Sequence, residues 1–168
     1  TAGFREYSEQ GRALEEEVLA VAEEYGIRFI GPNCIGVINM ENGFCVPFPR
    51  LTPFIRPGEV SVVSQSGGVG LSIMNHMAAE GIGLNKFTSA GNMLNIDAED
   101  LLEYYIEDEG TKIIFVYLES IRDGRRLMEV AKRSPNCEPG LVEIGSIVAM
   151  CGESAAFEHV AVGATQHL

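Results

Sequence analysis

Apolar and polar positions follow different periods in different parts of this chain. Apolar residues over about 14–25 recur at helical spacing, and Gly26 follows as a C-terminal stop. Residues 27–30 are apolar enough for a short strand. Residues 38–57 show no clear period and contain four prolines, which predicts a linker or crossover segment.

From Gly58 onward, apolar strand-like runs alternate with amphipathic segments. The expected strands are 60–64, 84–89 and 112–118, and the expected helices are 68–80, 98–108 (with Asp97 as N-cap) and 124–133. Continuous apolar strands separated by helices are typical of a parallel sheet covered on both faces. We therefore expect an α/β three-layer sandwich with a mainly parallel sheet over about 58–150. Residues 141–144 are a further candidate strand, and 154–162 a weak helix.

The strand at 60–64 leads directly into a Ser/Gly turn at the start of the next helix. Such a turn leaves backbone N–H groups of Ser66, Gly67 and Gly68 unpaired, and the helix dipole adds partial positive charge. This arrangement favours an anion, most often phosphate. The alternative is structural: Ser66 only caps the helix and Gly68 only packs against the sheet. The pattern is neither a complete G-x-G-x-x-G nor a P-loop.

Three loops follow the three expected strands, at Ser64–Gly68, Ser89–Asn92 and Glu119–Gly124. Parallel strands end at the same edge of their sheet, and ligands of such folds bind beyond that edge. We therefore expect these loops to lie together and to contain the functional site.

Composition narrows the class of protein. A formal net charge of −12 is unsuited to nucleic acid, which requires a basic face. The four cysteines lack metal-ligand spacing, which favours a reduced, cytoplasmic protein with no metal of its own. We expect no membrane association, because no apolar run approaches spanning length and no signal-peptide pattern opens the chain.

Several motifs together resemble one family. They are Thr1-Ala2-Gly3-Phe4, Gly31-Pro32-Asn33-Cys34, Ser64-Gln65-Ser66-Gly67, Gly91-Asn92, Asp100-Leu101-Leu102-Glu103-Tyr104 and Tyr117-Leu118-Glu119. In this order and spacing the chain resembles the NDP-forming acyl-CoA synthetases, relatives of the succinyl-CoA synthetase α subunit, and most of all the ADP-forming acetate–CoA ligases. The resemblance extends from residue 1 to about 134.

The resemblance implies a division of the chain. Residues 1–37 would be the C-terminal end of a Rossmann-like CoA-binding domain, and 38–57 a linker. Residues 58–168 would be a flavodoxin-like domain whose tail after 134 is atypical. The implied reaction interconverts acyl-CoA, phosphate and ADP with carboxylate, CoA and ATP, through an acyl phosphate and a phosphohistidine. ATP, ADP and Mg²⁺ would bind to an ATP-grasp domain or subunit outside this chain.

The resemblance also implies roles for particular residues. Asn33 and Cys34 would form one edge of the CoA site, and Ser66–Gly68 would hold the phosphate of the phosphohistidine. Glu119 would bond the catalytic imidazole, for which His159 is the candidate. The expected partners are CoA, a small carboxylic acid or acyl-CoA, and the ATP-grasp part. We also expect oligomers, because the N-terminal piece would expose a face that a missing half-domain covers.

Two alternatives remain at this point. Phe157 and Glu158 precede His159 where the family has small or hydroxyl residues, which favours a non-catalytic CoA-binding or assembly module that has lost the histidine chemistry. The loss of fit after Ser134 also suits a truncated, divergent or reading-frame-slipped tail. A flavin- or nucleotide-binding domain is a weaker alternative, since fold does not specify ligand and no aromatic pair flanks the turn.

Overall fold

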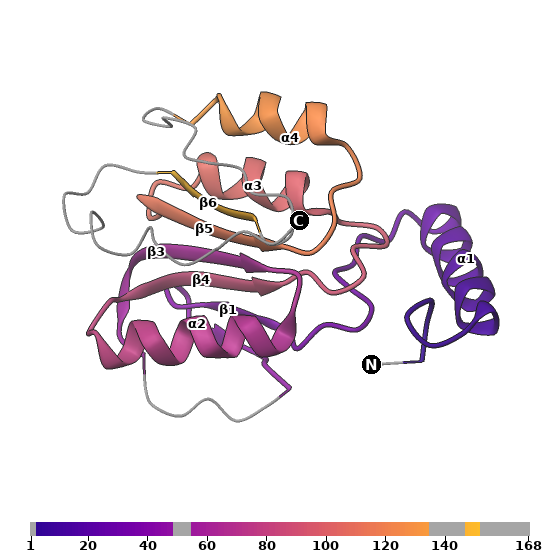
Figure 1. Ribbon diagram of the computed structural model, residues 1–168, viewed down its shortest axis with the longest axis horizontal. Coiled ribbons are helices and arrows are strands. Elements are labelled where there is room, and N and C mark those ends of the chain that lie inside the picture. The colour runs from indigo at the N-terminus through magenta and orange to yellow at the C-terminus, as the bar shows by residue number, and fades with distance from the viewer. Residues whose placement is uncertain (1–2, 49–54, 135–146, 152–168) are drawn as a thin grey trace, which may run out of the picture.

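The computed structural model describes residues 3–48, 55–134 and 147–151. Its helices are α1 (Glu9–Glu24), α2 (Gly67–Ala79), α3 (Ala98–Ile106) and α4 (Gly124–Ala131). Its strands are β1 (Val37–Asn39), β2 (Phe44–Cys45), β3 (Pro57–Ser64), β4 (Leu84–Ser89), β5 (Ile113–Leu118) and β6 (Ile147–Cys151). Helix α2 covers one face of the sheet while α3 and α4 cover the other (Figure 1). The expected three-layer α/β fold is confirmed.

The described strands form one mixed sheet in the order β2-β1-β4-β3-β5-β6. Strands β4, β3 and β5 are parallel, with Ser64 opposite both Ser89 and Tyr117. Strand β1 runs antiparallel to β4 and β2, and β6 runs antiparallel to β5. The expectation of a mainly parallel sheet therefore holds for the centre and needs correction at both sides, where short strands enter in the opposite direction.

The expected linker over 38–57 contains structure. Strands β1 and β2 form a hairpin there, and β1 extends the sheet through pairs such as Ile38 with Phe87. The two strands have three and two residues, too few for a period to be visible in the sequence. Residues 37–45 therefore extend the sheet.

The strand expected at 27–30 is absent from the described N-terminal segment. Its backbone instead runs beside the loop before α3, where Ile96 N–H donates to the Phe29 carbonyl (3.2 Å). The Phe29 N–H donates to Oδ1 of Asn95 (3.1 Å). Because its partners are a loop and a side chain, the segment forms no sheet ladder in spite of its apolar residues.

Two apolar clusters hold the layers together. The cluster under α3 and α4 contains Val63, Val116, Leu102 and the fully buried Tyr105. The cluster under α2 is built around Phe87, which is 0% exposed. Strand β3 contributes to both clusters because its successive side chains point to opposite faces. The parallel centre is therefore buried on both sides.

The helix boundaries follow from their caps. Asp97 accepts a hydrogen bond from the N–H of Asp100 (2.9 Å), as expected for the N-cap of α3. Helix α2 begins after Ser66, whose side chain accepts from the N–H of Val69 (3.4 Å). The candidate strand at 141–144 and the weak helix at 154–162, with His159 and His167, lie outside the described residues.

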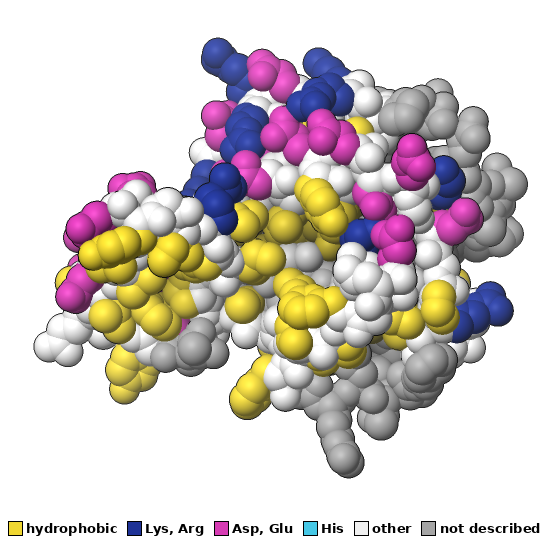
Figure 2. All heavy atoms as spheres, turned by 180° about the vertical axis from the view of Figure 1, so that it is seen from behind, with side chains coloured by type: hydrophobic (Ala, Val, Ile, Leu, Met, Phe, Trp, Pro, Cys, Tyr) yellow, Lys and Arg dark blue, Asp and Glu magenta, His cyan; other side chains and the backbone are white. Residues whose placement is uncertain are grey.

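Helix α1 and the turns around it form an N-terminal lobe, residues 3–30, beyond the carboxyl ends of the parallel strands (Figure 1). Its buried residues are Gly11, Glu15 and Ala22. Several large apolar side chains of the lobe point outward: Tyr7, Leu14, Val21, Tyr25 and Ile27 are 43–83% exposed. Figure 2 shows hydrophobic side chains gathered over this lobe. None of the described helices combines the length and apolar character needed to span a membrane.

Candidate functional site

The carboxyl ends of β3, β4 and β5 lie side by side, as the parallel registers require. The loops at 64–68, 89–92 and 119–124 consequently share one edge of the sheet. The Ala90 N–H donates to the Ser64 carbonyl (2.8 Å), which joins the first two loops directly. The prediction that topology brings these loops together is confirmed.

Gln65 joins the first loop to the third. Its backbone N–H donates to the Tyr117 carbonyl (2.9 Å), and its Oε1 accepts from the N–H groups of Glu119 (2.8 Å) and Ser120 (3.0 Å). Its Nε2 donates to Oγ of Ser120 (3.0 Å). Gln65 therefore fixes the backbone of Glu119 against the start of α2. Gln65 belongs to the Ser64–Gly67 motif, but the motif alone does not indicate its contacts with Glu119 and Ser120; a Gln between two serines at a strand end is the available signal.

The first turn of α2 presents unpaired amides at this edge. The N–H groups of Gly67 and Gly68 have no acceptor among the described residues. Gly68 is exposed, and a Cβ there would meet nothing within 4 Å. Ser66 caps the helix as the structural alternative requires, yet this leaves the two glycine amides available. The turn therefore has the donors that an anion needs.

Ser64 contributes differently from Ser66. Its side chain is fully buried, and its hydroxyl donates to the Ser66 carbonyl (2.7 Å). This bond shapes the turn and removes the Ser64 hydroxyl from the donors that could face a ligand. Ser66 and Gly68 also line a largely apolar cavity of about 600 Å³, which runs along α2 to Ile113 and Phe115.

Glu119 is exposed and follows the last residue of β5. No hydrogen bond or ion pair of its carboxylate is found among the described residues. Its backbone is fixed by Gln65, while its side chain is free to accept a donor from outside. The partner expected for it, His159, lies outside the described residues.

Asn33 and Cys34 lie in the turn that connects the lobe to β1. Asn33 adopts a φ of 54° and its Nδ2 donates to Oδ1 of Asn92 (3.3 Å). The Cys34 thiol is half-buried, free of any disulfide, and lies 3.8 Å from the Ile30 carbonyl. The next residue, Ile35, donates its N–H to Oγ of Ser89 (3.1 Å). The structure thus brings the 33–35 turn to the same edge as the Ser/Gly turn.

Close backbone packing fixes the relative position of these segments. A Cβ on Gly91 would lie 2.2 Å from the Pro32 carbonyl oxygen, and Gly91 has a φ of +58°. A Cβ on Gly67 would lie 2.5 Å from Cγ2 of Ile35. Both positions therefore require glycine for the 32–35 turn to approach the two loops this closely.

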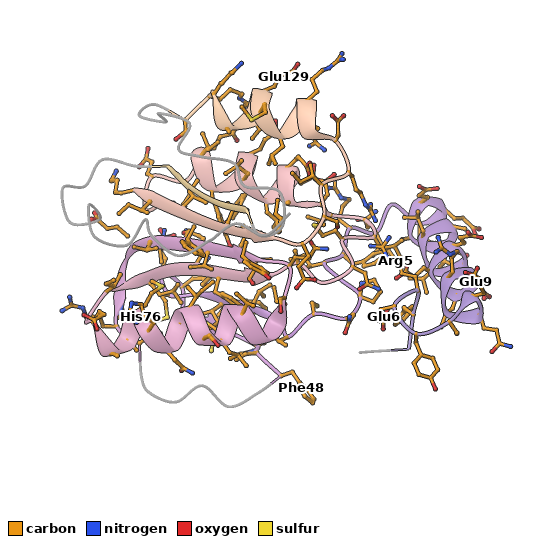
Figure 3. The ribbon with its side chains drawn as sticks, viewed as in Figure 1. Arg5, Glu6, Glu9, Phe48, His76 and Glu129 are labelled. Carbon is orange, nitrogen blue, oxygen red and sulfur yellow. The ribbon has the colours of Figure 1, made fainter. Side chains whose placement is uncertain are left out.

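Charged groups from the lobe complete the edge. Figure 3 shows Arg5 and Glu6 between α1 and the rest of the molecule. The Asn92 side chain donates to Glu6, which lowers the pKa of that carboxyl to about 2. Arg5 and Arg122 both donate to the backbone carbonyl of Asn92. No group of His, Cys, Asp and Glu side chains suited to a metal ion occurs among the described residues.

A mixed sheet between two helical layers, with the candidate site at the carboxyl ends of three parallel strands, defines a flavodoxin-like α/β domain. The family model for the succinyl-CoA ligase like flavodoxin domain matches residues 57–167. The chain belongs to this family.

The similar proteins are much longer than this chain. The α subunit of the ADP-forming acetate–CoA ligase II of Pyrococcus furiosus is 38% identical over 159 residues, which are 95% of this chain and 34% of that protein. A crystal structure of a Pyrococcus horikoshii protein is 41% identical with a TM-score of 0.74, covering 80% of this chain and 30% of that one. A dinucleotide-forming acetyl-coenzyme A synthetase 1 of Ca. Korarchaeum cryptofilum, in complex with phosphate and ADP, is 35% identical with a TM-score of 0.73. The aligned region covers 80% of this chain and 28% of the synthetase chain.

Proposed function

We propose that this chain is the part of an ADP-forming acyl-CoA ligase that holds the phosphoryl group during its transfer. The observation that carries the proposal is the junction of the Ser66–Gly68 amides with Glu119 at one sheet edge, braced by Gln65. The names of the similar proteins, an ADP-forming acetate–CoA ligase and an acetyl-coenzyme A synthetase bound to phosphate and ADP, support it.

In this proposal the phosphoryl group passes through a histidine. Phosphate displaces CoA from acyl-CoA to give an acyl phosphate and the thiol. The imidazole nitrogen then attacks the phosphorus, the bond to the acyl oxygen breaks, and the carboxylate leaves. The phosphohistidine finally transfers its phosphoryl group to ADP and regenerates the imidazole. CoA, the carboxylic acid and the nucleotide are substrates in this sequence.

Each candidate residue has a distinct task in it. The amides of Gly67 and Gly68 bind the phosphate oxygens, where the helix dipole favours negative charge. Glu119 accepts the N–H of the other imidazole nitrogen, which fixes the tautomer and stabilises the cation formed on phosphorylation. We keep His159 as the candidate for that imidazole. Asn33 and Cys34 form the CoA edge beside it.

The nucleotide and Mg²⁺ belong to another part of the enzyme in this proposal. The described residues offer no cluster of metal ligands, so none of them is assigned to Mg²⁺. An ATP-grasp domain or subunit would supply that site. Self-association is a further expectation, supported by the exposed Leu14, Val21 and Tyr25 of the lobe. A monomer in light scattering at high protein concentration would contradict it.

Phosphotransfer from labelled ATP tests the central claim. With a complementing ATP-grasp partner present, the chain should acquire phosphate that is labile in acid and stable in base. His159→Ala should remove this label, and Glu119→Gln should reduce it by about 10²-fold or more. Label that survives His159→Ala would refute the assignment of that histidine. Binding of CoA without any label would support the non-catalytic module instead.

The anion site has its own matched test. Gly68→Asp places a carboxylate at the first turn of α2 without a steric clash, because the space around Gly68 is open. The affinity of the Gly68→Asp variant for inorganic phosphate should fall by about tenfold or more, whereas the neutral Gly68→Asn variant should retain most of this affinity. Equal affinities in the two variants, measured by calorimetric titration, would show that the turn is only a structural cap.

A further inference from the structure

Asn92, at the strand-end edge, is hydrogen-bonded to several segments of the chain, and the proposed function does not explain these contacts. It lies in the loop after β4 and is 7% exposed. Its Nδ2 donates to Oε2 of Glu6 (2.8 Å) and to Oε1 of Glu15 (2.6 Å). Its Oδ1 accepts from Nδ2 of Asn33 (3.3 Å). Both polar atoms of this side chain therefore bind the N-terminal part of the chain.

The backbone of Asn92 is used as fully as its side chain. Its N–H donates to the Pro32 carbonyl (2.9 Å). Its carbonyl accepts from Nη2 of Arg5 and from Nη2 of Arg122 (3.3 Å). Arg122 comes from the loop after β5, so one residue connects the lobe, the 32–33 turn and the third strand-end loop.

The charges around Asn92 explain why the side chain is an amide. Glu15 is buried at 3% exposure, and its second carboxylate oxygen lies 3.5 Å from Nε of Arg5. Glu6 and Glu15 thus converge on a single NH₂ group, which gives one hydrogen to each. An aspartate of the same shape would supply no donor and would add a third negative charge.

The consequence extends to the candidate CoA edge. The Asn33 side chain is hydrogen-bonded to Asn92. Two residues further on, Ile35 donates its N–H to Oγ of Ser89, and its side chain packs closely against Gly67. Movement of the lobe would therefore displace the 33–35 turn relative to the Ser/Gly turn. Among the described residues, the hydrogen bonds from the lobe to the three strand-end loops all involve Asn92, so Asn92 is placed to control that geometry.

We propose that Asn92 is a positioning residue: its neutral amide holds Glu6 and Glu15, and through them the N-terminal lobe, in register with the Ser66–Gly68 turn. The consequence for CoA binding rests on the proposed function, whereas the effect on the lobe does not.

Asn92→Asp in the full chain tests the proposal, with Asn95→Asp as the matched control. The Asn95 Oδ1 only accepts a hydrogen bond, from the Phe29 N–H, so an aspartate there keeps the contact. In Asn92→Asp, amide hydrogen exchange in residues 9–24 should accelerate by about tenfold or more, while exchange in β3 and β5 stays unchanged. Asn95→Asp should leave both unchanged.

Rescue distinguishes positioning from a general loss of stability. In Asn92→Asp combined with Glu15→Gln, the new amide can donate to the new carboxylate, so exchange in 9–24 should return toward the wild-type rate. Binding of inorganic phosphate should be equal in all these variants, because the α2 turn is not altered. In the reconstituted enzyme, Asn92→Asp should raise KM for CoA by about tenfold with a smaller change in kcat.

Defined results would overturn the proposal. Unchanged exchange in 9–24 for Asn92→Asp would refute it, as would an equal acceleration in Asn95→Asp or no rescue by Glu15→Gln. If Asn92→Asp fails to fold, Asn92→Ala removes the donors without adding charge, and the same exchange pattern is expected. Wild-type protein that binds neither CoA nor phosphate would contradict the proposed function, while the exchange result would still decide the role of Asn92.

Discussion

The α/β core and the N-terminal lobe of this protein are held in place by different interactions. In the core, residues 60–64 of strand β3 are buried, and side chains such as Phe87 and Tyr105 are almost completely enclosed. In the lobe, the buried face of α1 carries Glu15, and large apolar side chains such as Tyr25 point outward. Apolar burial thus fixes the core, while the lobe is attached by hydrogen bonds and ion pairs around Asn92 together with the apolar contact of Ile30.

This difference has a general consequence for how each region responds to change. Burial of apolar area depends little on pH or on the screening of charge by salt, whereas contacts among carboxylates, guanidinium groups and amides depend on both. The candidate CoA edge lies in the turn that connects the lobe to β1, whereas the core carries the candidate phosphate turn. Conditions that weaken polar contacts should therefore separate the two halves of the site before they unfold the core.

The largest effect is expected from Phe87→Ala in the core. Removing a fully buried aromatic side chain should lower the free energy of unfolding by about 3–5 kcal/mol. The control is Phe48→Ala, where the side chain is 91% exposed and little change is expected. Denaturant titration measures both. Similar small losses of unfolding free energy in the two variants would contradict the conclusion that apolar burial around Phe87 stabilises the core.

Gly91→Ala should act on the joint between the regions. The new Cβ would collide with the Pro32 carbonyl and adopt an unfavourable φ, which we expect to cost about 2–4 kcal/mol. Gly26→Ala is the control, since Gly26 has a φ of +64° and open space around it. The difference between the two isolates the close approach of the 32–35 turn to the loop after β4. Equal destabilisation would show that backbone strain alone explains both.

Glu99 is an exception that sharpens the comparison, because it is an acid inside the core. It is 2% exposed, its Oε1 has no hydrogen-bond partner among the described residues, and burial raises its pKa. A raised pKa means that the carboxylate destabilises the fold increasingly as pH rises above its usual range. Glu99→Gln should therefore stabilise the protein by about 1 kcal/mol at neutral pH and less near pH 4. A stability gain independent of pH would contradict this explanation.

The smallest effect should come from acid acting on Glu6. Its pKa is lowered from 4.5 to about 2, chiefly by the Asn92 side chain. The stability that ionised Glu6 contributes to the folded protein is complete above pH 4.5 and is lost as pH falls toward 2. Hydrogen exchange in α1 should accelerate over this window and do so less in Glu6→Gln. The same acceleration in wild type and variant would mean that other carboxylates hold the lobe.

Much of the core was predictable because its signals are local. The strand at 84–89 and the N-cap at Asp97 agree with the structure, since a buried strand and a capped helix each have a short sequence pattern. The hairpin at 37–45 was missed because its strands are too short for a period and depend on pairing with distant β4. The prediction of a strand at 27–30 is wrong, because hydrogen bonds to the loop before α3 replace the expected sheet pairing.

The candidate site divides in the same way. The Ser66–Gly68 turn and its closeness to Glu119 could be predicted, because both follow strands that the sequence indicates to be parallel. The brace at Gln65 and the junction at Asn92 were not predicted, because each depends on side-chain contacts between residues more than 50 positions apart. A buried Glu15 is likewise unexpected on a helix whose charged residues normally face solvent.

The order of strands in the sheet also determines the order in which the protein can be built during synthesis. Strands β3, β4 and β5 come from one continuous stretch, Pro57–Leu118, and can pair as soon as that stretch has left the ribosome. Strand β1 is synthesised first yet must wait for β4, its partner about 50 residues later. We therefore expect the nascent chain to assemble from its middle outward, with the CoA-side turn joining a phosphate-side centre that has already formed.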